Sequence, residues 1–205
     1  MSKVTISHTN SKLGDMIPSV SLAPECSCRK DAPCAKGCYA KKGNFTFSNV
    51  HDSHVANYNA YMENHREYFQ QIIKAVGGKM LAYRFFRWHV AGDIVDTDYL
   101  EGMCMVARAC KTTKFLCFTK KFDLVNDYVA TGKKIPNNLH IVFSAWHKAF
   151  KVPNPYNFPM AYVFFKKSDM NPDIPSLAIP CQGHCESCLA CWSLKKGQSV
   201  VFNQH

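Results

Sequence analysis

The chain has 205 residues, 47% of them hydrophobic, and its 25 lysines and arginines against 15 acidic residues give a net charge of +10. This length and hydrophobic fraction suit one domain with its own core, and they exclude a disordered chain. No apolar run reaches the roughly eighteen residues of a membrane-spanning helix. Residues 1–16 are polar and lack the apolar core of a signal peptide. We therefore expect a single cytoplasmic domain, residues 1–205, whose eleven cysteines stay reduced.

Strand-like and helix-like segments alternate along the chain. Hydrophobic spacing, glycine stops and aromatic runs predict helices at residues 53–76, 97–110 and 122–131, and strands at 79–90, 114–119, 139–146, 160–165 and 176–179. This alternation is typical of parallel strand–helix–strand units. The predicted fold class is therefore α/β, with either a partial parallel barrel or an open sheet, and with cysteine-rich segments at both ends.

Parallel α/β folds bind their ligands beyond the carboxyl ends of the strands. The residues that follow the predicted strands are 89–93, 119–121, 144–147 and 180–181. Among them, Asp93 is a candidate to accept hydrogen bonds from a ligand amine; the alternatives are that it caps the following helix or pairs with Arg87. Lys120 is a candidate to face an anionic ligand, or else a solvated loop residue. His89 and His147 are candidate ligands or proton donors, although a lone histidine more often has a structural role.

The cysteines fall into three groups. The C-terminal group consists of Cys181, Cys185, Cys188 and Cys191, separated by three, two and two residues. Four thiolates at this spacing can surround one inorganic centre, and the C-x2-C-x2-C run is the spacing of iron–sulfur proteins. Structural zinc, the main alternative, more often uses two distant pairs of ligands.

The N-terminal group consists of Cys28, Cys34 and Cys38, separated by five and three residues. Three ligands would leave one iron of a four-iron cluster free to bind a substrate or cofactor. Cys26 is a doubtful fourth ligand. The two groups can hold one cluster each, or pool their ligands around one centre. The remaining cysteines lie in apolar segments and are expected to pack in the core: Cys104, Cys110 and Cys117.

Several segments resemble, in the same order, the phage gene product 88 family. They are CRKDAPCAKGCYAKKGN at 28–44, RWHVAGDI at 87–94, FLCFTKK at 115–121, CESCLACW at 185–192 and VVFNQH at 200–205. The resemblance implies a phage or prophage origin and an iron–sulfur protein with a partial-barrel fold akin to radical S-adenosylmethionine enzymes. It maps the family's cysteines onto the seven cysteines of the N-terminal and C-terminal groups. The family has no settled reaction, so the resemblance implies a cofactor without naming a substrate.

The kinship with radical enzymes implies that S-adenosylmethionine would bind the open iron of a [4Fe–4S] cluster. Gly92 and Asp93 would then stand in for the turn that hydrogen-bonds its amine, with Asp93 and Lys120 as candidate catalytic residues. This sequence departs from the usual cysteine loop, because Lys41 occupies the place of the third cysteine and Cys28 would replace it from upstream. The alternative is a cluster used for electron transfer or for binding a small anion.

Basic residues flank both cysteine-rich segments: Arg29, Lys30, Lys36, Lys41, Lys42, Lys195 and Lys196. They can stabilise an anionic cluster and steer an acidic electron donor such as a flavodoxin or ferredoxin. The expected function is redox or radical chemistry on a small-molecule ligand at an open cluster, in the cytoplasm of an infected anaerobic prokaryote. The alternative is a non-enzymatic zinc or iron–sulfur module that binds nucleic acid or a host protein, without a membrane partner.

Overall fold

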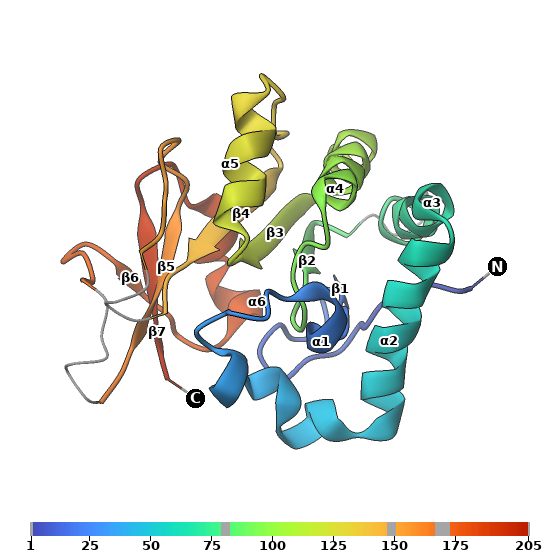
Figure 1. Ribbon diagram of the computed structural model, residues 1–205, viewed down its shortest axis with the longest axis horizontal. Helices are drawn as coiled ribbons and strands as arrows, with labels where there is room; N and C mark the ends of the chain where they lie inside the picture. The colour runs from blue at the N-terminus through green and yellow to red at the C-terminus, as the bar shows by residue number, and fades with distance from the viewer. Residues whose placement is uncertain (1, 79–82, 147–150, 167–172, 205) are drawn as a thin grey trace.

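A parallel sheet of seven strands runs through the computed structural model, which describes residues 2–78, 83–146, 151–166 and 173–204 (Figure 1). The strand order is β1-β2-β3-β4-β5-β7-β6, and every pairing is parallel. The strands are β1 (Ser19–Val20), β2 (Phe85–Trp88), β3 (Lys114–Thr119), β4 (Leu139–Ser144), β5 (Met160–Phe164), β6 (Ile179–Pro180) and β7 (Ser199–Asn203). The predicted α/β class and open parallel sheet are therefore confirmed.

Helices connect most of the strands. The α-helices are α1 (Pro24–Ser27), α2 (Ser48–Glu63), α3 (His65–Val76), α4 (Thr97–Ala109), α5 (Phe122–Ala130) and α6 (Cys185–Cys188). Single 3-10 turns lie at Ala35–Gly37, Tyr39–Lys41, Gly43–Thr46 and Ala190–Ser193. In the described part of the chain, no helix has both the length and the apolar character needed to cross a bilayer.

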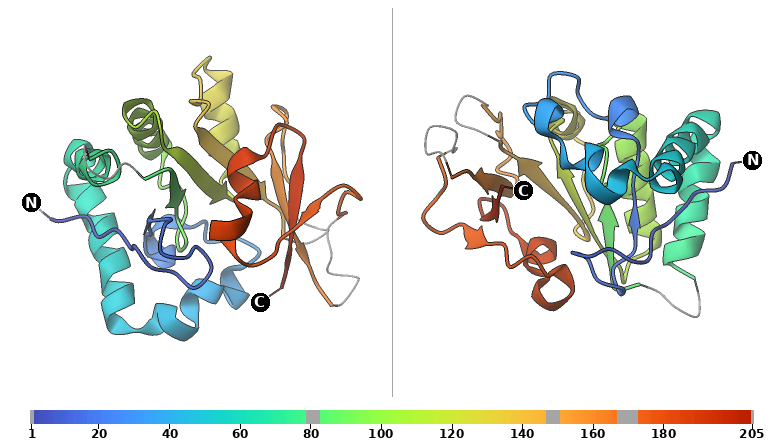
Figure 2. Two further views of the ribbon diagram at one scale, coloured as in Figure 1. Left: turned by 180° about the vertical axis from the view of Figure 1, so that it is seen from behind. Right: turned by 90° about the horizontal axis from the view of Figure 1, so that it is seen from below.

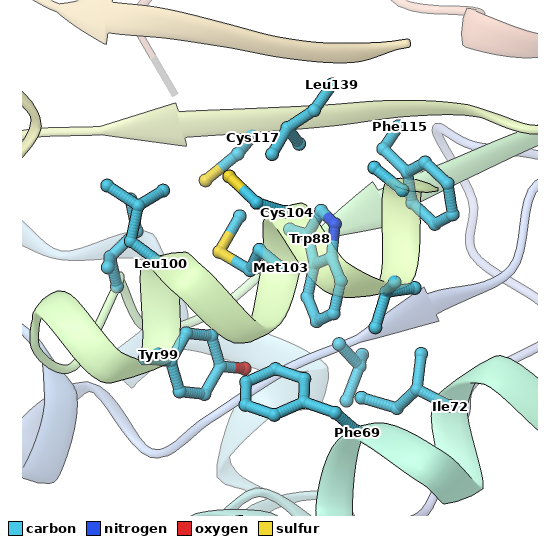
Figure 3. Packing of buried hydrophobic residues seen from close by; sticks show 14 of the residues in the cluster. Phe69, Ile72, Trp88, Tyr99, Leu100, Met103, Cys104, Phe115, Cys117 and Leu139 are labelled. Atoms are coloured by element: carbon cyan, nitrogen blue, oxygen red, sulfur yellow. The ribbon is translucent and has the colours of Figure 1, made fainter. Parts of the chain in front are cut away.

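The two faces of the sheet carry separate cores, because successive strand residues point to opposite sides. On one face, Trp88 and Phe115 pack against α3 and α4 around Phe69 and Tyr99 (Figure 3). The other face has a smaller core, made of Leu13, Ile17, Leu116, Val142, Ala161, Trp192, Leu194 and Val200. The segment that contains α6 covers this second face, which Figure 2 shows from behind and from below. The sheet thus separates the main helices from the C-terminal cysteines.

Two predicted elements have different boundaries in the structure. The helix expected at residues 53–76 begins earlier, at Ser48, and is broken at Asn64, whose extended backbone (φ −158°) ends α2. The Asn64 side chain then accepts a hydrogen bond from the Glu67 amide and caps α3, which is the usual role of asparagine at a helix start. The strand expected at 79–90 is shorter, because His89 adopts a left-handed conformation (φ 56°) directly after β2; residues 79–82 lie outside the described ranges.

The remaining differences concern the sheet. The strand expected at 139–146 is shorter in the structure and forms β4. The strand expected at 176–179 is shifted along the chain and forms β6. Two strands were not predicted, β1 and β7. Strand β1 pairs with β2 in parallel register, with Val20 beside Trp88. The chain that follows β1 therefore leaves the sheet at the same edge as residues 89–93.

Candidate metal centres

The N-terminal cysteine group lies beyond the carboxyl edge of the sheet, since the chain passes directly from β1 into α1 and the cysteine loop. Proline at the first turn of α1 favours the start of this short helix. Ser27, which is 1% exposed, closes the turn by donating its hydroxyl to the Ala23 carbonyl at 2.9 Å. The same hydroxyl oxygen accepts the Asp93 amide at 3.2 Å. This contact joins the cysteine loop to the turn after β2.

Gly92 allows that close approach. Its φ of 89° lies in the region that only glycine adopts without strain, and a Cβ there would meet the Leu22 carbonyl oxygen at 2.6 Å and the Ser27 hydroxyl at 2.7 Å. The Leu22 amide also donates to the Ala91 carbonyl at 3.0 Å. Gly92 therefore packs the turn after β2 against the chain that leads to the N-terminal cysteine group.

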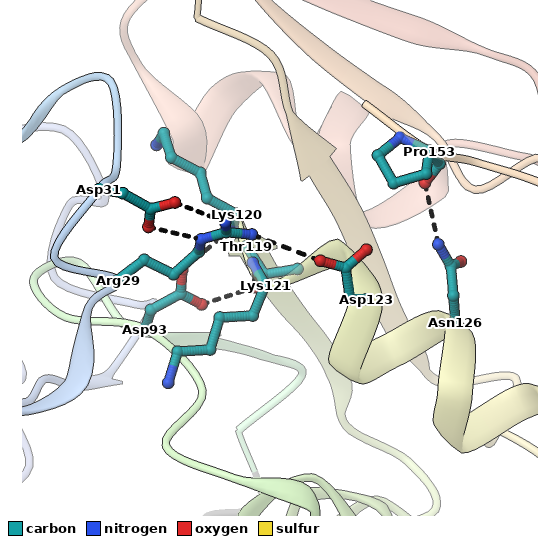
Figure 4. A network of polar contacts seen from close by, with 9 residues as sticks. All are labelled: Arg29, Asp31, Asp93, Thr119, Lys120, Lys121, Asp123, Asn126 and Pro153. Carbon is teal, nitrogen blue, oxygen red and sulfur yellow. Dashed lines mark hydrogen bonds and ion pairs between the residues drawn. The ribbon is translucent and has the colours of Figure 1, made fainter. Parts of the chain in front are cut away.

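Asp93 holds the ends of β2 and β3 together (Figure 4). Its carboxylate accepts hydrogen bonds from the Thr119 hydroxyl at 2.6 Å, the Lys120 amide at 3.0 Å and the Ile94 amide at 2.8 Å. Burial raises the pKa of Asp93, and the hydrogen bonds from Thr119 and Lys120 oppose that rise. Both simpler interpretations of Asp93 are wrong: the cap of α4 is Asp96, and the partners of Asp93 do not include Arg87.

The Cys28 thiol lies in the electrostatic field of this carboxylate. Burial raises the pKa of Cys28 to about 12, with further upward contributions from Asp93, Cys38 and Cys34 and a downward one from Lys120. A thiol with this pKa stays protonated at neutral pH unless a cation replaces the proton. The structure thus brings the N-terminal group together with Asp93 and Lys120, which were predicted from distant parts of the sequence.

A second contact fixes the cysteine loop to the neighbouring strand–helix corner. The Arg29 guanidinium pairs with Asp31 in its own loop at 2.8 Å and approaches Asp123 at the start of α5 at 3.6 Å (Figure 4). The Lys120 ammonium lies 5.6 Å from the centre of the Trp146 ring, in a cation–π contact. The Arg29–Asp123 contact therefore links the cysteine loop to the start of α5.

The C-terminal cysteine group surrounds one cavity on the opposite face of the sheet. All four cysteines line a space of about 50 Å³, together with strand residues that include Arg87 and Phe118. Left-handed backbone at Gly183 (φ 83°) and Leu189 (φ 53°) turns the chain around it. Two backbone hydrogen bonds fix the first part of the segment: the Cys181 amide donates to the Val201 carbonyl and the Cys185 amide to the Lys12 carbonyl, each at 2.8 Å. Because these turns direct four thiols to one space, the group fits a compact inorganic centre.

The N-terminal residues support this cavity from outside. Leu13 and Ile17 pack with Trp192 in the smaller core. The Glu186 carboxylate accepts the Met16 amide at 3.0 Å, and any side chain at Gly14 would overlap Glu186. Trp192 is 1% exposed and donates its indole N–H to the Phe86 carbonyl at 3.1 Å. Trp192 therefore packs in the core and also lines the cavity.

Arg87 is the residue of this site that the sequence did not single out as functional. It lies on β2 between two residues that face the helices, Phe86 and Trp88, so the alternation of the strand turns it toward the cavity. Its charge lowers the pKa of Cys185 and Cys191, although burial is the larger effect and raises the pKa of Cys191 to about 12. In the sequence, the one feature that could have indicated this role is a charged residue, Arg87, among the aromatic residues of β2.

The seven candidate ligands are thus divided between two places. The three N-terminal cysteines lie in and just before the loop that follows α1 at the sheet edge, and the four C-terminal cysteines line one cavity. In the part of the chain that the structure describes, no set of three or more His, Cys, Asp or Glu side chains is arranged to hold a metal ion. Cys26 is exposed on α1, and Cys104, Cys110 and Cys117 are buried, so the predicted core role of these three is confirmed.

The two histidine candidates differ in outcome. His147 lies outside the described residues. His89 is 2% exposed; its ring contacts the Tyr99 hydroxyl at 3.1 Å and the Cys117 sulfur at 3.7 Å. Burial and the charges of Arg87 and Lys121 lower the pKa of His89 to about 3. His89 is therefore a neutral histidine of the core, which is the structural interpretation.

This burial predicts an acid sensitivity of the fold. The unfolded chain binds a proton on His89 near pH 6.5, whereas the folded chain binds it only near pH 3, so the free energy of unfolding falls as the pH drops below 6.5. When the pH is lowered from 7.5 to 5.5, the free energy of unfolding of His89→Asn should therefore fall by about 1 kcal/mol less than that of the unaltered protein. Asparagine suits the left-handed backbone at this position. Urea unfolding under argon at both pH values measures the difference, and equal losses in the two proteins would contradict it.

A family model described as gene product 88 matches residues 2–198. No curated protein and no solved structure matches the chain.

Proposed function

Since this chain belongs to the gene product 88 family, we propose that it is an iron–sulfur protein with two [4Fe–4S] clusters. The N-terminal group would hold an open cluster, at which redox or radical chemistry takes place on a small molecule. The C-terminal group would hold a closed cluster that relays electrons to it. The observation that carries the proposal is the division of seven cysteines into a group of three that follows β1 at the sheet edge and a group of four around one cavity.

The arrangement of the thiols supports clusters over single zinc ions. A zinc ion needs four ligands at about 2.0–2.3 Å from one point. The described cysteines are not gathered so closely, yet the four C-terminal ones line a common space. A four-iron cluster binds each sulfur through a different iron, so it accepts thiolates that are further apart. The protons held by Cys28 and Cys191 would leave as the metal binds.

The residues around the N-terminal group support a ligand site. They lie beyond the carboxyl ends of parallel strands, where α/β proteins bind ligands. When bound, S-adenosylmethionine would supply radical chemistry at such a site. Asp93 would face its amine with the carboxylate oxygen whose one hydrogen-bond donor among the described residues is the Lys120 amide. The Lys120 ammonium would face an anionic group. Gly92 would hold the turn in place rather than contact the ligand.

Exposed lysines around the N-terminal group favour an acidic electron donor as partner. They are Lys30, Lys36, Lys41 and Lys42. Because they surround the loop that would hold the open cluster, a flavodoxin or ferredoxin docked there would be close to it. The same charges suit a module that binds nucleic acid, which is the second candidate function.

Anaerobic purification followed by iron, sulfide and zinc analysis tests the metal. We expect about eight irons and eight sulfides per chain, and an electron paramagnetic resonance signal on reduction. A colourless protein with stoichiometric zinc would overturn the proposal and favour the binding module. The cofactor is tested separately: S-adenosylmethionine should alter the signal of the reduced protein and yield 5′-deoxyadenosine. An unchanged signal without that product would leave an electron-transfer protein.

A further inference from the structure

We propose that Arg87 is the counter-cation of the C-terminal centre, and that its charge sets the reduction potential of the metal group held by Cys181, Cys185, Cys188 and Cys191. This inference rests on the proposed function, because it concerns the same cavity. The role of Arg87 cannot be inferred from the spacing of the cysteines.

The first argument is position. Residues of β2 alternate between the two faces, and Arg87 lies on the face that α6 covers, in register with Ser19 of β1 and Leu116 of β3. Leu116 belongs to the smaller core, and Arg87 lines the cavity together with all four cysteines. Its neighbours Phe86 and Trp88 are fully buried on the opposite face. The strand therefore holds Arg87 beside the thiols.

The second argument is that the charge of Arg87 has no compensating partner. Its Nε donates to the Trp88 carbonyl at 3.0 Å, one terminal nitrogen contacts the His89 carbonyl at 3.5 Å, and the guanidinium lies 4.3 Å from the centre of the Phe118 ring. Among the described residues, no carboxylate forms an ion pair with Arg87. These neutral contacts orient the cation without neutralising it, and a half-buried unpaired cation is costly. An anionic centre in the cavity would remove that cost.

The third argument is the charge of the expected centre. Four thiolates around a [4Fe–4S] core give a net anion, and a nearby cation stabilises the more negative, reduced form. The chain just beyond Arg87 also contacts the loop of the N-terminal group. The hydroxyl of Tyr39, the residue after Cys38, donates to the Val90 carbonyl, three residues beyond Arg87. Burial raises the pKa of Tyr39, and the charge of Arg87 opposes that rise.

Redox titration of variants tests the inference. The full chain with Cys28→Ser, Cys34→Ser and Cys38→Ser would carry only the C-terminal cluster, and Arg87→Gln, Arg87→Lys and Arg84→Gln would be added to it in turn. We expect Arg87→Gln to shift the midpoint potential to more negative values, Arg87→Lys to keep most of the original value, and Arg84→Gln to leave it unchanged. Arg84 is the matched control, because it is exposed and precedes the same strand.

The outcomes separate this inference from the proposed function. A protein without iron would overturn the proposed function itself. Bound iron whose potential is the same in Arg87→Gln as in the parent would overturn only the role of Arg87, as would equal shifts in the glutamine and lysine variants, which would point to packing. If Arg87→Gln cannot hold the cluster, then full iron content in Arg87→Lys supports the charge requirement, and loss in both variants overturns it.

Discussion

Replacing Cys28 by serine is expected to remove about four of about eight bound irons and to leave the C-terminal cluster in place. The reason is that Cys28 lies at the start of the loop that carries Cys34 and Cys38, whereas the cavity on the other face is lined by the C-terminal group alone among the candidate ligands. Cys191→Ser should give the converse result, with the N-terminal cluster retained. Iron analysis and electron paramagnetic resonance of the anaerobically purified variants measure both losses.

Cys26→Ser is the matched control, since Cys26 lies two residues from Cys28 and is exposed on α1. It should keep its full iron content. If Cys28→Ser and Cys191→Ser each abolish all bound iron, the two groups share one centre, and the assignment of two clusters would be wrong. That outcome would restore the possibility, open at the level of sequence, that the two ends of the chain pool their ligands.

Trp192→Ala should destabilise the fold by about 3–5 kcal/mol, because it removes a large side chain that is 1% exposed and leaves a cavity in the smaller core. The Trp192 ring packs edge-on against Phe85 at 5.9 Å, and its N–H satisfies the Phe86 carbonyl. Trp192 follows Cys191 directly, so the last ligand of the C-terminal group should lose its support as well. We expect both a lower midpoint in urea and a loss of iron.

Trp192→Phe separates the two contributions of the tryptophan. This variant keeps most of the buried surface but removes the hydrogen bond, so its free energy of unfolding should fall by about 1–2 kcal/mol. Urea unfolding under anaerobic conditions gives the free energy of each variant. Wild-type stability in Trp192→Ala would show that the C-terminal segment does not pack on the sheet as described here.

The sequence was sufficient where hydrophobic spacing was long and regular. Strand β3 has the predicted bounds, and α4 and α5 each differ from them by one residue. Two residues are too few for any alternation, so β1 could not be recognised in Ser19–Val20. The break at Asn64 was hidden because apolar residues continue at helical spacing on both sides of it.

For the candidate site too, the sequence predicted local groups of residues but not contacts between distant parts of the chain. Cysteine spacing indicated which residues belong together, because Cys181 to Cys191 lie within one short segment. The neighbours of those residues come from elsewhere in the chain, and this could not be read from spacing. Arg87 reaches the C-terminal group through the side-chain alternation of β2, and Asp93 reaches Cys28 only because β1 pairs with β2. Long-range strand pairing decides such contacts.

The support of the C-terminal cavity by residues 10–17 has a consequence for the order in which the protein folds. Leu13 packs with Trp192, and the Lys12 carbonyl accepts the Cys185 amide, so contacts across nearly the whole chain complete the cavity. Contacts of such large sequence separation form late, because the entropy of closing the intervening loop must be lost first. Strand β7 must also insert between β5 and β6. The helical face can therefore form before the cavity does, and the C-terminal thiols would remain accessible from solvent until the final stage of folding.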